Sequence, residues 1–144
     1  MSKINIFRIL AVLTTLFIFS NSLKTASISS EESGRIVMIV SWILEQFGKI
    51  VDPEVLQNIV RKVAHFAEFG LQGFLLFGCF DRKAKDRIVY VLFLGLFTAC
   101  TDEFLQLFSE GRGSQIQDVF IDFAGTVAGF LFGCILWSVW RRRK

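Results

Sequence analysis

Hydrophobic residues in this chain occur in four long runs separated by shorter polar segments. The runs cover residues 4–20, 62–80, 88–108 and 118–140. A helix needs about 20 residues to cross a hydrocarbon core about 30 Å thick. The last two runs meet this length by themselves, whereas the first two are short and need their flanking residues. The pattern predicts an all-α integral membrane protein, a four-helix bundle in which residues 1–144 form one domain.

The segment between the first two runs, residues 21–61, predicts a loop that contains an amphipathic helix. Ser29 and Glu32 have the spacing of a capping box. The apolar residues that follow recur with the spacing of one helix face: Ile36, Val40, Ile43, Phe47 and Ile50. The segment carries too many charges to span, so we expect this helix on the membrane surface or packed on the bundle. Asp52 and Pro53 then predict the N-cap and first residue of the next helix.

Basic residues gather at the N-terminus, in residues 81–87 and in residues 141–144. If these three segments are cytoplasmic, that side holds ten of the sixteen Lys and Arg residues but only two of the thirteen acids. The positive-inside rule therefore predicts an N-in/C-in, multi-pass membrane protein with residues 21–61 outside. The first run also fits a cleaved signal peptide, so its retention as an anchor stays open.

Composition supports the membrane class. Hydrophobic residues make up 53% of the chain and charged residues 20%, whereas soluble domains average about 45–50% and about 25%. The net charge of +3 does not indicate a nucleic-acid partner. Cys79, Cys100 and Cys134 lack metal-ligand spacing and lie outside the outer loops, so we expect them to be packing residues. The sequence predicts association with the lipid bilayer and leaves the oligomeric state open.

Polar side chains interrupt three of the runs near their predicted outer ends. Arg61, His65, Glu68 and Gln72 share one face of the second helix because they are spaced by four, three and four residues. Ionisable residues within a membrane normally face inward and pair, so we expect a shared polar pocket. The residues expected to bind a ligand there are Arg61, His65, Glu68, Asp102, Glu103, Gln106, Arg112, Asp118 and Asp122. The alternative is a set of interhelical salt bridges that only orders the bundle.

The fourth run also carries Gly125, Gly129 and Gly133, which form a small-residue stripe. Such a stripe serves either dimerisation or close packing within one chain. Because it continues the face of Asp118 and Asp122, we favour packing within the chain.

Several classes of enzyme are excluded because the chain lacks the residues or motifs that they require. His65 is the only histidine, which excludes a two-histidine phosphatase, and neither Gly-x-Ser-x-Gly nor a phosphate-binding Gly-x-x-x-x-Gly-Lys loop is present. If the pocket is catalytic, its candidate residues are His65, Glu68, Asp102 and Glu103. The sequence requires no cofactor, although its surplus of carboxylates is compatible with a divalent cation such as Mg²⁺, Ca²⁺ or Mn²⁺.

These motifs together resemble the VanZ-like family of small bacterial membrane proteins over essentially the whole chain. The similar segments are residues 61–70 (RKVAHFAEFG), residues 101–108 (TDEFLQLF), Arg112 with the following Gly-Ser, and Asp118 with the glycine stripe. Two positions depart from the family pattern. Phe69 stands where the family usually has Tyr, and Asp122 stands where it usually has Asn.

The resemblance implies a location in the bacterial cytoplasmic (inner) membrane but does not settle the mechanism. Two functions of different classes are compatible with the residues of the pocket. The namesake of the family is linked to low-level resistance to the glycopeptide antibiotic teicoplanin. This favours a non-enzymatic envelope protein that binds a lipid-linked or cell-wall component in an outward-facing polar pocket. The alternative is a membrane enzyme acting on a lipid-linked phosphate or cell-wall precursor at the outer leaflet. In that case His65 would be the acid–base group or nucleophile, and Arg61 and Arg112 would hold phosphate.

Overall fold

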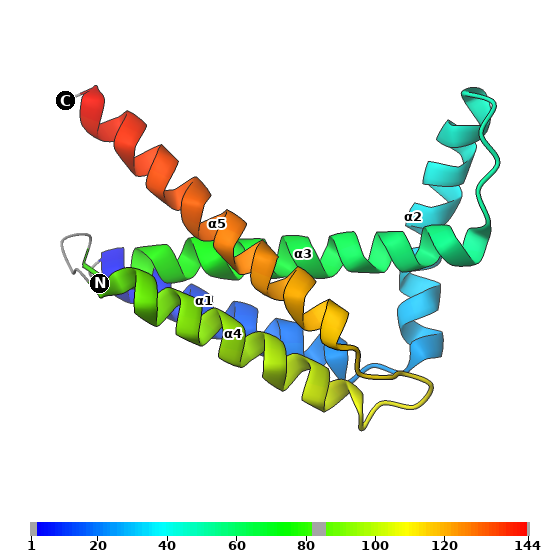
Figure 1. Cartoon of the computed structure of the whole chain (residues 1–144), viewed down its shortest axis with the longest axis horizontal. Coiled ribbons are helices and arrows are strands. Elements are labelled where there is room, and N and C mark those ends of the chain that lie inside the picture. The colour runs from blue at the N-terminus through cyan, green and yellow to red at the C-terminus, as the bar shows by residue number, and fades with distance from the viewer. Residues whose placement is uncertain (1–2, 82–85, 144) are drawn as a thin grey trace.

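The computed structural model describes residues 3–81 and 86–143. Within these ranges the chain forms five helices and no strand (Figure 1). The helices are α1 (Lys3–Ser22), α2 (Ala26–Gln46), α3 (Pro53–Cys79), α4 (Arg87–Gln106) and α5 (Ile116–Arg142). The prediction of an all-α fold is thereby confirmed.

The longest axis of the molecule follows α3, with α1 and α4 beside it, α5 crossing it obliquely and α2 lying across its N-terminal part (Figure 1). The start of α1, the end of α3, the start of α4 and the end of α5 all lie toward one end. We call this the apolar end (residues 3–14, 73–80, 87–95 and 130–142). The opposite end holds α2 and the connection between α4 and α5, and we call it the polar end (residues 18–33, 56–68 and 99–122).

Within residues 3–81 and 86–143, three helices are long and apolar enough to cross a membrane: Ile4–Ser22, Arg87–Gln106 and Ile116–Arg142. These confirm three of the four predicted spans by length and composition. The fourth, on α3, does not meet the same criterion because its polar face interrupts the apolar sequence. A bundle of four spanning helices therefore remains a prediction. Large apolar side chains on α1 and α4, such as Val12, Phe17 and Phe93, are more than half exposed, as lipid-facing residues should be.

The amphipathic segment does form a helix, but it begins earlier than predicted. Thr25, not Ser29, is the N-cap of α2, and its Oγ1 accepts a hydrogen bond from the backbone N–H of Ile28 (3.5 Å). The backbone N–H of Ala26 donates to the carbonyl of Glu110 (3.0 Å), which ties the start of α2 to the α4–α5 connection. The predicted capping box is wrong because this contact between distant segments sets where the helix starts.

The apolar face predicted for α2 does not pack on the bundle. Ile43 and Phe47 remain 44% and 76% exposed, whereas the buried residue of the helix is Ser33. The Gln57 amide of α3 donates to the Ser33 hydroxyl (3.4 Å). Contact with α3 therefore runs through polar groups, and the apolar face is left free for a membrane surface.

The start of α3 agrees with the sequence prediction. The Asp52 carboxylate accepts a hydrogen bond from the backbone N–H of Glu54 (2.8 Å), and Pro53 is the first helical residue. A helix of 27 residues is about 40 Å long. Such a length places the side chains of α3 at both ends of the bundle.

The glycine stripe lies where α5 crosses α3 at close range. A Cβ atom on Gly125 would overlap the backbone of Phe66, and one on Gly129 would overlap the carbonyl of Gly70. On the facing helix, Gly73 lies equally close to the backbone of Thr126. The predicted packing within the chain is thereby observed. Beyond this crossing, toward the apolar end, Phe77 and Phe130 join the buried core, with their ring centroids 5.9 Å apart.

Candidate functional site

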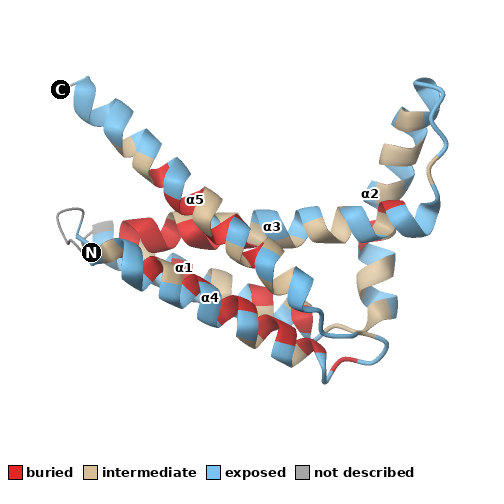
Figure 2. Cartoon of the chain, viewed as in Figure 1, coloured by how far each residue is buried: buried red, intermediate tan, exposed pale blue. Residues whose placement is uncertain are grey.

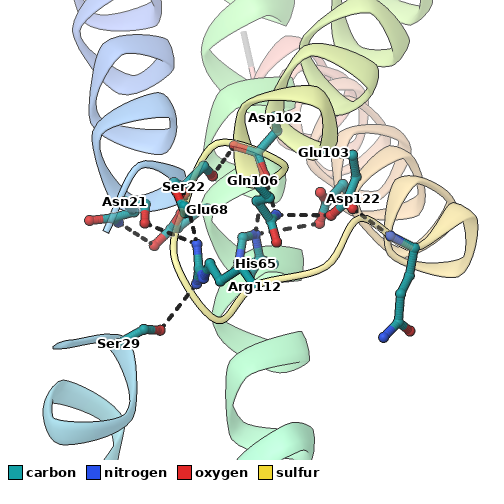
Figure 3. A network of polar contacts seen from close by, with 12 residues as sticks. Asn21, Ser22, Ser29, His65, Glu68, Asp102, Glu103, Gln106, Arg112 and Asp122 are labelled. Atoms are coloured by element: carbon teal, nitrogen blue, oxygen red, sulfur yellow. Dashed lines mark hydrogen bonds and ion pairs between the residues drawn. The ribbon is translucent and has the colours of Figure 1, made fainter. Parts of the chain in front are cut away.

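The polar end contains a network of hydrogen bonds between α1, α3 and α4 (Figure 3). The Asn21 amide at the end of α1 donates to the Glu68 carboxylate of α3 (3.0 Å). The next residue, Ser22, is fully buried, and its hydroxyl donates to the carboxylate of Asp102 on α4. The end of α1 therefore holds a carboxylate on each of two other helices.

His65 lies at the centre of the site (Figure 3). Its Nδ1 atom lies 3.8 Å from Asp102 Oδ2 on α4 and 3.8 Å from Asp122 Oδ1 on α5. Both carboxylates are fully buried in the folded chain. Neither oxygen of Asp122 has a hydrogen-bond partner among the described residues, and neither does His65 Nδ1. A buried carboxylate is costly without compensation, so this part of the network requires a positive charge or a proton.

The second acid of α4, Glu103, is hydrogen-bonded on both of its oxygens. The Gln106 amide donates to Glu103 (2.9 Å) and also to Asp102 (3.1 Å), so that one side chain holds two neighbouring acids. The other Glu103 oxygen accepts the backbone N–H of Gln115 (2.8 Å), which is the residue before α5. This bond places a negative charge at the N-terminus of α5, where the helix dipole favours it.

Arg112 connects the α4–α5 connection to the end of α1. Its guanidinium donates to the carbonyls of Asn21 (3.1 Å) and Ser22 (3.2 Å), and to the hydroxyl of Ser29 (3.1 Å). Gly111 permits the sharp turn before it, with a φ of 74°. Burial, followed by the nearby Arg61 guanidinium, lowers the pKa of Arg112. Arg61 and Arg112 therefore concentrate positive charge in one part of the site.

A cavity of about 330 Å³ opens between these groups. Its charged lining comes from α3, α4, α5 and the connecting loop: Arg61, Lys62, His65, Glu103, Arg112, Asp118 and Asp122. Lys62 and Asp118 form an ion pair in this lining (2.8 Å). A smaller cavity of about 160 Å³ beneath α2 shares Arg61, His65 and Arg112 with the first. Cationic groups on one wall can bind an anion, and carboxylates with an imidazole on the other can bind a cation.

The structure brings together all nine residues expected at the pocket. Seven line the larger cavity: Arg61, His65, Glu103, Gln106, Arg112, Asp118 and Asp122. Glu68 lines the smaller cavity, and Asp102 lies buried behind His65. Ligand binding by these residues remains a prediction.

Several supporting groups were not assigned a role from the sequence. Asn21 and Ser22 hydrogen-bond to carboxylates of Glu68 and Asp102, and neither contact was predicted from the sequence. The amide of Gln72 donates to Thr15 (2.9 Å) and Thr98 (3.1 Å) from two other helices. The detectable signal was the presence of threonines within the two apolar runs that contain Thr15 and Thr98.

Comparison with known proteins identifies the family. A search of curated proteins gives no match, and a search of solved structures also gives none. The model of the VanZ/LLP1 family matches residues 7–138, which is nearly the whole chain and includes every residue of the site described above. With this coverage, the chain belongs to the VanZ/LLP1 family.

Proposed function

We propose that this protein binds the phosphate-bearing head group of a bacterial envelope component in the cavity between Arg61, Lys62 and Arg112. The observation that carries the proposal is the pair of arginines lining one cavity. The Nε atoms of Arg61 and Arg112 are both buried without a hydrogen-bond partner among the described residues. Guanidinium groups bind phosphate through paired, charge-assisted hydrogen bonds, so both arginines offer donors to an anion.

The local charges support an anionic ligand on this side of the cavity. Lys62 is paired with Asp118, whereas Arg112 donates hydrogen bonds to carbonyl and hydroxyl oxygens that carry no charge. The pKa of Arg112 is lowered by burial and by Arg61. An anion bound between the two arginines would compensate for the burial of Arg112 and for its repulsion by Arg61.

The proposed orientation places this cavity at the outer leaflet. With the apolar end cytoplasmic, the basic residues at the end of α5 face inward, in accordance with the positive-inside rule. The cavity then lies at the depth of lipid head groups in the cytoplasmic membrane. Binding an envelope component there would change how a glycopeptide such as teicoplanin reaches its target, which is how we relate the site to resistance.

The proposal is tested by lipid binding to the purified protein in neutral detergent. The probes are short-chain phosphatidylglycerol, the matching diacylglycerol without phosphate, and inorganic phosphate. We expect phosphatidylglycerol to bind more tightly than diacylglycerol. Arg61→Gln should weaken its binding at least about tenfold, because hydrogen bonds to charged groups contribute about 1.5–3 kcal/mol.

The matched control is Arg35→Gln, which removes the same charge from an exposed position on α2. It should bind phosphatidylglycerol as the wild type does. Equal binding of diacylglycerol, or equal losses in the two variants, would contradict the proposal. Binding of inorganic phosphate alone would indicate that a free anion is the ligand.

A second candidate function is favoured by the position of His65. Its Nδ1 lies 3.8 Å from two buried carboxylates and its side chain lines the same cavity, an arrangement suited to acid–base chemistry on a lipid-linked phosphate. Phosphate release from phosphatidic acid in mixed micelles tests this function. Catalysis predicts release that His65→Gln abolishes, while absence of release with bound lipid would leave binding as the function.

A further inference from the structure

Three ligand-type atoms from three different helices converge at the floor of the cavity. His65 of α3, Asp102 of α4 and Asp122 of α5 each present one such atom, and these three atoms lie within 4.8 Å of one another. The imidazole nitrogen is 3.8 Å from an oxygen of each carboxylate. Two ligands at about 2.1 Å from an ion in a tetrahedral site lie about 3.4 Å apart, so each 3.8 Å pair needs an approach of about 0.4 Å. The remaining pair needs an approach of at most about 1.4 Å.

The hydrogen bonds of these residues are those expected of metal ligands, and not of salt bridges that only order the bundle. Asp122 is 1% exposed in its side chain, and both of its oxygens lack a hydrogen-bond partner among the described residues. Asp102 is oriented by the hydroxyl of Ser22 and the amide of Gln106. Ligating carboxylates are commonly held in this way by a second layer of donors. One acid is therefore pre-oriented, and the other has both oxygens available.

The net charge around the cavity is also compatible with a bound divalent cation. Five acids face three permanent cations in this region, the acids being Glu68, Asp102, Glu103, Asp118 and Asp122 and the cations Arg61, Lys62 and Arg112. With every acid ionised and His65 neutral, the surplus is two negative charges. One divalent cation would balance it.

We propose that His65, Asp102 and Asp122 bind one divalent transition-metal ion of the Zn²⁺ or Mn²⁺ class. The mixed ligand set determines this class, because imidazole favours Zn²⁺ and later transition metals while carboxylates suit Mn²⁺ and harder ions. The sequence indicated only that a surplus of carboxylates is compatible with a divalent cation. Asp122 is also the position at which this chain departs from the usual Asn of the family.

The geometry leaves part of the coordination sphere open toward the cavity. His65 and Asp122 line the cavity, while Asp102 lies behind them in the helix interface. Three protein ligands with an open position are typical of metal sites that take a water or an external ligand. The ion would therefore face the side of the cavity that carries Arg61 and Arg112, and would add to its positive potential.

The test uses Mn²⁺ as the only probe. The purified protein, with no histidine tag, is stripped with a chelator, dialysed against Mn²⁺ and examined by metal analysis and pulsed electron paramagnetic resonance. We expect one Mn²⁺ per chain with coupling to one imidazole nitrogen. Because His65 is the only histidine in the chain, that coupling identifies the ligand without any substitution. No stoichiometric binding, or bound Mn²⁺ without nitrogen coupling, would overturn the proposal.

Two variants provide a matched comparison. Asp122→Asn removes a proposed ligand and should weaken Mn²⁺ binding at least about tenfold. Glu110→Gln removes the same charge from an exposed position in the α4–α5 connection that lines neither cavity, and should retain about one Mn²⁺ per chain. Equal effects of the two substitutions would show that bulk negative charge, not this site, attracts the ion.

The metal proposal and the phosphate proposal can fail separately. The Mn²⁺ experiment contains no lipid or phosphate, so its result does not depend on head-group binding. Arg61→Gln should lose phosphatidylglycerol binding and keep Mn²⁺. Loss of Mn²⁺ in Arg61→Gln would contradict the assignment of the ion to His65, Asp102 and Asp122.

Discussion

The two ends of the bundle are both closely packed, but burial has opposite consequences in them. At the apolar end, side chains such as Leu75, Phe77 and Val91 are buried against one another, and each burial is favourable. At the polar end, Asp102, Glu103 and Asp122 are buried to a similar extent, which is unfavourable for a charge. Figure 2 shows buried residues both in the C-terminal half of α3 and at the end of α4.

The difference between the ends bears on whether the polar residues only order the bundle. If salt bridges between the helices served only to order the bundle, the most deeply buried charge should be part of an ion pair. Here the ion pair between Lys62 and Asp118 is partly exposed, whereas the one ion-pair partner of the buried Asp122 within the described residues is the His65 ring, at 3.8 Å. The polar end therefore retains an uncompensated group that packing alone does not require.

The largest expected effect concerns which end faces outward. In a variant whose natural cysteines are replaced by alanine, a membrane-impermeant maleimide should label Glu110→Cys at the polar end in intact cells. Arg142→Cys at the apolar end should react only after the cells are permeabilised. The reverse pattern would place the cavity in the cytoplasm and exclude the proposed encounter with envelope components.

The next largest effect is expected where α5 crosses α3. Gly129→Leu should lower the free energy of unfolding by about 3 kcal/mol or more, because the backbone at Gly70 has no flexible group that can move aside. Thermal unfolding in detergent measures this loss. Gly34→Ala is the control, since a Cβ there meets nothing within 4 Å and should be neutral or slightly stabilising. Similar losses in both would show that the crossing is not the critical contact.

A smaller loss of stability is expected when the hydrogen bond from Ser22 to Asp102 is removed. Ser22→Ala removes a buried donor to that carboxylate, and hydrogen bonds to charged groups contribute about 1.5–3 kcal/mol. The exposed Ser27→Ala should change stability by less than about 0.5 kcal/mol in the same unfolding experiment. An unchanged Ser22→Ala protein would mean that Asp102 does not depend on α1.

The smallest effect is expected at Gln72, between the two ends. Gln72→Leu should cost less than about 1 kcal/mol, because Thr15 and Thr98 keep their bonds to carbonyls of their own helices (3.0 and 2.8 Å). The replacement also removes a carbonyl oxygen that is buried without a partner among the described residues. A loss above about 2 kcal/mol on unfolding would show that the polar network extends to this depth.

Local sequence rules predicted those parts of the fold that depend on neighbouring residues. Asp52 and Pro53 start α3 as expected, because capping needs only the first turn of the helix. The spacing of His65 and Glu68 placed both on one face, and both contribute to the site. The start of α2 was predicted wrongly because it depends on the carbonyl of Glu110, more than eighty residues away.

The sequence by itself determined the helical class, three spanning segments, the family and the set of polar residues, because periodicity and hydropathy are properties of contiguous residues. Only the tertiary structure decided which of those polar groups meet. It paired Asn21 with Glu68 and Ser22 with Asp102, and it left Asp122 facing His65. Those outcomes depend on the rotation and separation of helices, which no stretch of contiguous residues fixes. For His65 and Asp122, the glycine contacts between α3 and α5 allow the two backbones to approach closely.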